Sequence, residues 1–152
     1  MGLTFYIGFM GCGKSTLGRL HAAEQGKRFV DLDAVFLQET GKTPAIYLTH
    51  KGEPAFRKEE QKVLHKTVAQ WMADGRPAQI IACGGGTPCF FDNLQFMKEH
   101  GHVVFIDTPL ATILDRLMRQ PERWPLAQKQ APQILYKERR KWYEQAHERL
   151  VP

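Results

Sequence analysis

The chain has 152 residues, of which 43% are hydrophobic and 24% are charged, and its formal net charge is +5. This length suits one domain over residues 1–152, and no apolar run approaches the roughly 20 residues of a membrane span. The excess of basic over acidic residues is compatible with binding of anionic small molecules. Because acids are interleaved with the basic residues of the second half, we do not expect nucleic acid as a partner.

The cysteines and the N-terminal run bear on the cellular compartment. Three cysteines without metal-ligand spacing are typical of reduced thiols rather than of a disulfide framework. The apolar run LTFYIGF is too short for a signal peptide. We therefore expect a cytoplasmic protein that does not associate with membranes.

Short apolar segments alternate with longer helical patterns along the chain. The predicted strands are rich in β-branched and aromatic residues, and they cover 3–9, 28–33, 78–84 and 102–108. The predicted helices cover 14–25, 33–41, 54–75, 91–101 and 109–120. This alternation predicts an α/β fold, with a parallel sheet covered by helices on both faces.

The segment GFMGCGKST, residues 8–16, joins the first predicted strand to the first predicted helix. Gly8, Gly13, Lys14 and Ser15 match the phosphate-loop pattern G-x-x-x-x-G-K-[ST]. The glycines let backbone N–H groups converge, Lys14 supplies a cation for the phosphates, and Ser15 offers a hydroxyl to Mg²⁺. The pattern predicts an ATP site with the residues Gly11, Cys12, Gly13, Lys14, Ser15 and Thr16.

Two acids stand where the second predicted strand meets a helix. If the chain is still extended there, Asp31 and Asp33 point to the same side, toward the ligand crevice at the carboxyl ends of the strands. One carboxylate, Asp31, can attend Mg²⁺, and the other, Asp33, can accept a hydroxyl proton. The alternative is that Asp33 caps the next helix.

Two further stretches suggest a site for the phosphate acceptor. Arg57 and Glu60 share one face of a predicted helix, where they form either a guanidinium fork held for a substrate carboxylate or an ordinary surface ion pair. Gly84, Gly85 and Gly86 follow a buried strand, and their lack of side chains suggests close approach of a ligand, a flexible loop being the alternative.

Together these motifs resemble the shikimate kinase family in order and near spacing, over about residues 3–150. The resemblance implies a three-layer P-loop fold and MgATP-dependent phosphorylation of the 3-hydroxyl of shikimate, on the way to chorismate and aromatic amino acids. It implies that Asp33 is the base and that Gly84 to Gly86 line the acceptor pocket. Arg57 and Arg139 would grip the carboxylate, with helices of about residues 33–62 forming the acceptor side. The alternative for Arg139 is one more charge on a basic helix.

The chain departs from the family pattern in its lid, about residues 119–130. The family's lid carries an arginine directly before Pro-Leu, whereas this chain has Trp124 there and Arg123 one residue earlier. We expect Arg123 to reach the transferring phosphates and count it, with Asp33 and Lys14, among the catalytic residues. Arg116 is expected at the ATP site, where it or Arg119 stacks on the adenine.

The second departure is at the C-terminus, where the family continues with a fifth strand that we expect this chain to lack. The expected sheet order is therefore 2-3-1-4, with an exposed edge on the fourth strand. We expect a monomer, although a dimer that covers this edge is an alternative.

Two other functions are compatible with the sequence. One is a different small-molecule P-loop kinase, such as a gluconate kinase, against which the Arg57–Glu60 pair and the triple glycine argue. The other is a regulatory or vestigial nucleotide-binding module, favoured only by the altered lid and the short C-terminus.

Overall fold

The computed structural model describes residues 2–124 and 130–152, apart from the side chain of Arg123. Its centre is a parallel sheet of five strands in the order β2-β3-β1-β4-β5. The strands are β1 (Leu3–Ile7), β2 (Arg28–Asp31), β3 (Gln79–Ala82), β4 (His102–Ile106) and β5 (Glu148–Leu150). The expected α/β class and parallel sheet are confirmed.

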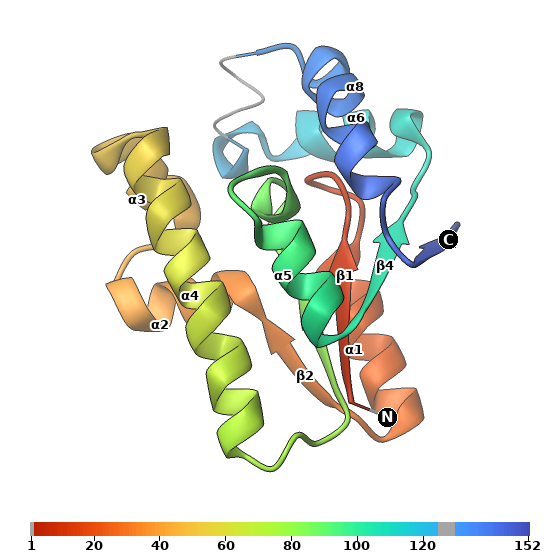
Figure 1. Ribbon diagram of the computed structural model, residues 1–152. Coiled ribbons are helices and arrows are strands. Elements are labelled where there is room, and N and C mark those ends of the chain that lie inside the picture. Colours follow the sequence, from red (N-terminus) through yellow and green to blue (C-terminus); the bar gives the residue numbers. More distant parts are fainter. Residues whose placement is uncertain (1, 125–129) are drawn as a thin grey trace.

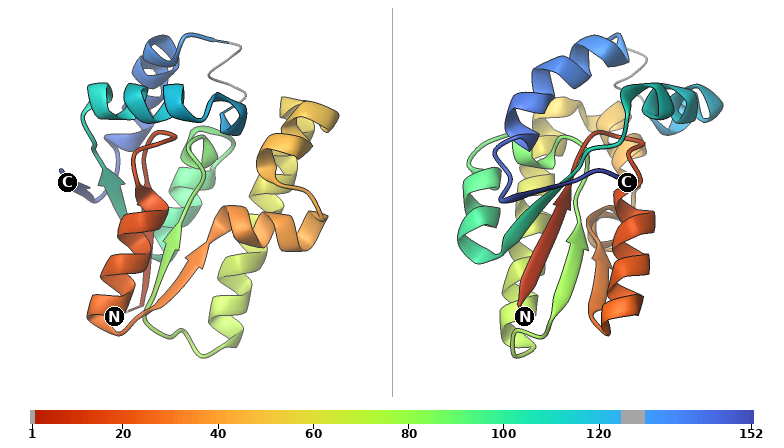
Figure 2. Two further views of the ribbon diagram at one scale, coloured as in Figure 1. Left: turned by 180° about the vertical axis from the view of Figure 1, so that it is seen from behind. Right: turned by 90° about the vertical axis from the view of Figure 1, so that its right-hand side faces the viewer.

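Helices cover both faces of this sheet, which gives three layers. Helix α1 lies on one face, and α4 and α5 lie on the other (Figures 1 and 2). Helices α6 and α8 lie over the carboxyl ends of the strands, at the top of Figure 1. The helices are α1 (Lys14–Gln25), α2 (Leu32–Thr40), α3 (Pro44–Lys51), α4 (Glu53–Ala73), α5 (Asn93–His100), α6 (Leu110–Arg119) and α8 (Pro132–Tyr143), with short 3-10 turns η1 (Thr87–Cys89) and η2 (Pro121–Arg123).

The core lies between the sheet and these helices. The central strand β1 contributes Phe5 and Ile7, both fully buried. The apolar stripe of α4 is buried as its helical spacing predicts, through Val63, Leu64 and Val68. No helix among the described residues is long and apolar enough to cross a membrane.

The prediction that the fifth strand is missing is wrong. Strand β5 pairs in parallel with β4, from Val104 opposite Glu148 to Ile106 opposite Leu150. Two of its three residues are charged, so it carries no apolar pattern, and the unpaired N–H and C=O groups of β4 are what order it. The β4 edge that suggested a covering dimer is thus paired within the chain.

Each predicted strand extends two residues too far at its carboxyl end. The strands end at residues 7, 31, 82 and 106 rather than at 9, 33, 84 and 108. In each case the chain leaves the sheet there, and a residue within three positions of each of these strand ends, Met10, Asp33, Gly84 or Thr108, lines the pocket described below. The sequence also does not predict α3, which begins with a Thr43 cap and Pro44.

Candidate active site

The phosphate loop lies between β1 and α1, and its lysine folds back over it. The Lys14 Nζ donates to the carbonyl oxygens of Gly8 at 2.9 Å and Phe9 at 3.1 Å. A Cβ at Gly8 would lie 2.8 Å from both the Cys12 Sγ and the Ile106 carbonyl oxygen, so only glycine fits. The Lys14 ammonium therefore lies against the phosphate loop, whose backbone N–H groups lead into the first turn of α1.

The two acids of the DLD stretch have different structural roles. Asp31 ends β2 and caps α2, since its Oδ1 accepts from the Asp33 N–H at 2.9 Å. Its Oδ2 accepts from the Ser15 hydroxyl, also at 2.9 Å. The condition that both acids be extended is not met, because Asp33 is already in α2, and the helix cap is Asp31 rather than Asp33.

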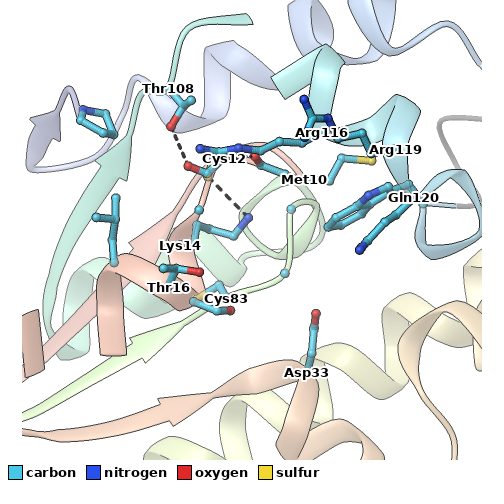
Figure 3. Close-up of a pocket in the computed structure, with 18 residues that line it drawn as sticks. Met10, Cys12, Lys14, Thr16, Asp33, Cys83, Thr108, Arg116, Arg119 and Gln120 are labelled. Carbon is cyan, nitrogen blue, oxygen red and sulfur yellow. Dashed lines mark hydrogen bonds between the residues drawn. The ribbon is translucent and has the colours of Figure 1, made fainter. Parts of the chain in front are cut away.

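A pocket of about 460 Å³ joins the phosphate loop to Asp33. Figure 3 shows the Asp33 side chain pointing into it from the start of α2, with Arg116 and Arg119 on the opposite wall. Lys14 lines the same pocket. The predicted ATP residues Gly11, Cys12, Gly13, Lys14, Ser15 and Thr16 all lie in its wall.

The triple glycine contacts three parts of the site at once. A Cβ at Gly84 would lie 2.9 Å from the Glu60 Oε2 and 3.5 Å from the Asp33 Oδ1. A Cβ at Gly85 would lie 2.9 Å from the backbone nitrogen of Met10, in the phosphate loop. At Gly86 it would lie 2.6 Å from both terminal nitrogens of Arg57. The protein's own groups occupy the space above these glycines, while Gly84 and Gly85 also line the pocket.

Arg57 is a buried charge, with 4% of its side chain exposed, so the surface-pair alternative is wrong. Its Nη1 donates to the Glu60 Oε1 at 3.0 Å, and its Nη2 donates to the Glu53 Oε2 at 3.1 Å. The Phe90 ring stacks on the guanidinium at 4.2 Å. The Glu60 Oε2 accepts from the Thr87 hydroxyl at 2.9 Å. This set of contacts fixes the guanidinium in one orientation.

Arg139 is also buried, with 6% exposed, unlike most charges on α8. It lies one helical turn before Tyr143, whose hydroxyl donates to the Gly85 carbonyl oxygen at 2.6 Å. Burial raises the pKa of the Cys89 thiol to about 11, and Arg139 and Arg57 both act against this rise. Arg57 lies beside Gly86, and Arg139 lies one turn from the Tyr143 that is bonded to Gly85, although neither arginine is part of the pocket wall.

The lid is described only in part. Residues 125–129 and the Arg123 side chain lie outside the described part of the chain, so the expected role of Arg123 stays a prediction. Trp124 lines the pocket. Arg116 lies over the phosphate loop, where its Nη1 donates to the Gly11 carbonyl oxygen at 2.8 Å. Arg119 pairs with Asp115 on the surface of α6.

Sequence reasoning missed the polar pair that follows β4. The Thr108 hydroxyl donates to the Cys12 carbonyl oxygen at 2.6 Å and so holds the phosphate loop. Asp107 accepts from Arg140 and Arg149, and the Arg140 hydrogen bonds hold its pKa below the ordinary range. The signal was present, because Asp-Thr follows a buried strand as Asp33 follows β2.

The residues around Ser15 and Asp31 fit a magnesium ion that is shared with a nucleotide. A hydroxyl oxygen and a carboxylate oxygen are hard donors of the kind that Mg²⁺ prefers. Within the described residues, no cluster of three or more His, Cys, Asp or Glu could hold a metal. A cation here would therefore need the phosphates and water as its remaining ligands.

A phosphate loop at the carboxyl end of a central parallel strand, with a carboxylate facing its lysine across a small pocket, defines a P-loop phosphotransferase that acts on a hydroxyl group. The family model for shikimate kinase matches residues 10–152. The chain belongs to the shikimate kinase family.

Individual relatives agree with this assignment. The chain is 37% identical over 148 residues to a shikimate kinase of Persephonella marina, covering 96% of this chain and 86% of that one. Its fold matches shikimate kinase from Acinetobacter baumannii in complex with shikimate, with a TM-score of 0.87 and 33% identity over 99% of this chain and 83% of that one. The structure from Bacteroides thetaiotaomicron matches with a TM-score of 0.83 and 30% identity, over 99% and 86%.

Proposed function

We propose that this chain transfers the γ-phosphoryl group of ATP to the 3-hydroxyl of shikimate, giving shikimate 3-phosphate and ADP. The observation that carries the proposal is the glycine run, whose three residues contact Asp33 and Glu60, the phosphate loop, and Arg57 in turn. A phosphate donor and a carboxylated alcohol could meet there across one short gap. The family membership supports the choice of shikimate as the acceptor.

Lys14 and the loop N–H groups are proposed to bind the β- and γ-phosphates. In place of its present bonds to Gly8 and Phe9, the ammonium would donate to phosphate oxygens. Ser15 and Asp31 would hold Mg²⁺, which when bound neutralises charge on the phosphate oxygens. Arg116, already over the loop, would contact the nucleotide, and Arg123 would close on the phosphates from the lid.

Asp33 is proposed to accept the proton of the attacking hydroxyl. As that oxygen bonds to the γ-phosphorus, the bond from phosphorus to the bridging oxygen breaks and ADP leaves. Arg57 and Arg139 would hold the acceptor carboxylate, because two buried guanidinium groups favour an anion between them. The site thus works mainly by positioning and charge stabilisation.

An ADP-release assay with shikimate, gluconate and no acceptor tests this proposal. We expect turnover with shikimate that exceeds the other two by at least about 100-fold, because gluconate has no ring to place its hydroxyl and carboxylate together. Faster turnover with gluconate would favour the other kinase class. Nucleotide binding without turnover on any acceptor would favour a regulatory module.

We also propose that the protein is cytoplasmic and monomeric. Sedimentation of the purified chain tests the monomeric state.

A further inference from the structure

Helix α8 carries Arg139, and two of its other side chains make polar contacts with distant segments of the described structure. One such anchor is the Tyr143 hydroxyl, which donates to the Gly85 carbonyl oxygen at 2.6 Å. The other is Arg140, whose Nη1 and Nη2 donate to the two carboxylate oxygens of Asp107 at 3.0 and 2.9 Å. Around the helix, Arg139 lies about 40° from Tyr143, while Arg140 lies about 60° from Tyr143 and about 100° from Arg139.

The Arg140 anchor is built as a fixed contact. Asp107 is buried, with 8% exposed, and the hydrogen bonds from Arg140 lower its pKa, so it stays ionised. Arg140 also donates to the Tyr136 hydroxyl, one turn earlier on α8. Its guanidinium stacks over the Phe105 ring of β4 at 5.4 Å. We call Asp107, Tyr136 and Arg140 the α8 brace.

The α8 brace is continuous with the phosphate loop at both ends. The Tyr136 ring packs edge-to-face on Phe9, with ring centroids 5.3 Å apart. At the other end, Thr108 follows Asp107 directly and donates to the Cys12 carbonyl oxygen at 2.6 Å. Phe9 and Cys12 both belong to the phosphate loop, so the contacts close a ring from loop to α8 to β4 and back.

We infer that Arg140 is a positioning residue for the phosphoryl acceptor: it fixes the roll of α8 and so places the Arg139 guanidinium beside the glycine run. Tyr143 and the buried Leu135 also hold α8, and loss of the Arg140 contact weakens this restraint on rolling of the helix about its axis. A roll of 10° moves a side-chain tip about 6 Å from the axis by about 1 Å. Misplacement of that size costs up to about 100-fold at a reacting site. The inference rests on the proposed role of Arg139 in holding the acceptor carboxylate.

The test compares Arg140→Ala with Glu144→Gln in the full-length chain, using shikimate and MgATP. Glu144, the residue directly after α8, contacts the same guanidinium at 3.0 Å, so its loss leaves the bond to Asp107 in place. We expect Arg140→Ala to raise the KM for shikimate about tenfold while the KM for ATP changes less than about twofold. Glu144→Gln should leave both values unchanged.

A double variant separates positioning from general stability. If Arg140 acts through Arg139, then Arg140→Ala should add nothing to the KM increase that Arg139→Ala causes. Should Arg140→Ala fail to fold, Arg140→Lys keeps the charge without the two-point contact, and we expect a rise of about threefold. A lower melting temperature with an unchanged KM for shikimate would overturn the inference. So would additive effects in the double variant.

The same measurements distinguish this inference from the proposed function. If Arg139→Ala leaves the KM for shikimate unchanged, the proposed acceptor site is wrong and the inference falls with it. If Arg139→Ala raises that KM and Arg140→Ala does not, only the role of Arg140 is wrong.

Discussion

The two halves of the proposed site differ in how far apart along the sequence their residues stand. The phosphate side is local: Lys14 and the carbonyl oxygens that it contacts, of Gly8 and Phe9, lie within seven consecutive residues. The acceptor side is assembled from α4, the glycine run and α8, and Arg57 and Arg139 stand more than 80 positions apart.

This difference has an energetic consequence. The phosphate loop binds through backbone N–H groups, which no single side-chain substitution removes. The proposed acceptor side depends on buried charges, and the loss of Arg57 would leave Glu53 and Glu60 without a cation. We therefore expect substitutions on the acceptor side to change acceptor binding and stability together, and substitutions of groups at the reacting atoms to change turnover alone.

The largest effect expected is that of Asp33→Asn. The amide keeps the shape of the side chain but cannot accept the hydroxyl proton, so kcat should fall by up to about 10⁴-fold. Nucleotide affinity, measured by titration with ADP, should stay nearly unchanged, because Asp33 lies across the pocket from the loop. A proportional loss of nucleotide affinity would mean that Asp33 has a structural role.

The lid gives the next largest effect. We expect Arg123→Ala to slow phosphoryl transfer by about 10³-fold, since an arginine that neutralises transition-state charge has effects of this order. Trp124→Ala, at the neighbouring position, should slow it less. Single-turnover kinetics of the two variants tests this order, and the reverse order would assign the lid role to Trp124.

Arg57→Ala should raise the KM for shikimate by about 100-fold, the loss expected for a buried charged hydrogen-bonding partner. It also leaves Glu53 and Glu60 without their shared cation, so we expect a loss of about 3–5 kcal/mol in unfolding free energy. Urea denaturation measures that loss. Arg28→Ala, which breaks an exposed pair with Asp74, is the control and should leave the KM unchanged.

Gly86→Ala tests the same contact without removing a charge. The new Cβ would lie 2.6 Å from the Arg57 nitrogens, so the guanidinium must move, and we expect the KM for shikimate to rise about tenfold. The backbone at Gly86 has a φ of −96°, which alanine adopts without strain. In an Arg57→Ala background the substitution should have little further effect. A full additional loss there would show that Gly86 acts independently of Arg57.

The smallest effect expected is a pH dependence of stability that arises at His147, which belongs to neither half of the proposed site. Desolvation of the ring lowers the pKa of His147 from its ordinary value of 6.5, and Lys98 and His102 act in the same direction, although the residue as a whole is exposed. The unfolded chain therefore takes up this proton first, and stability falls as the pH drops below about 6.5. Protonation also opposes the hydrogen bond from the Val103 N–H to the His147 Nδ1, at 3.0 Å.

The fall in stability caused by protonation of His147 should appear in melting temperatures measured between pH 7.5 and 5. We expect His147→Asn to reduce the fall over this range by about 1–2 °C, because the asparagine oxygen accepts the same bond without titrating. His50→Gln, on α3, serves as the control. An unchanged pH profile in His147→Asn would contradict this prediction.

Much of the fold followed from pattern alone, and the missed strand has a clear physical cause. The four predicted strands and their parallel arrangement are confirmed, because apolar runs between helical patterns constrain them strongly. Strand β5 was missed because three residues with two charges have no period. Its order comes from pairing with β4, which no local pattern encodes.

By itself, the sequence determined the phosphate loop, the α/β class and the residue types of the acceptor side. Short-range geometry fixes a loop of this kind, since its binding groups are backbone amides of consecutive residues. Only the tertiary structure decided that Arg57 and Arg139 are buried charges, that Gly86 leaves room for the Arg57 guanidinium, and that Asp107, directly after β4, binds Arg140 of α8. Burial and ion pairing depend on which distant segments pack together, and the spacing of residues along a chain does not specify that.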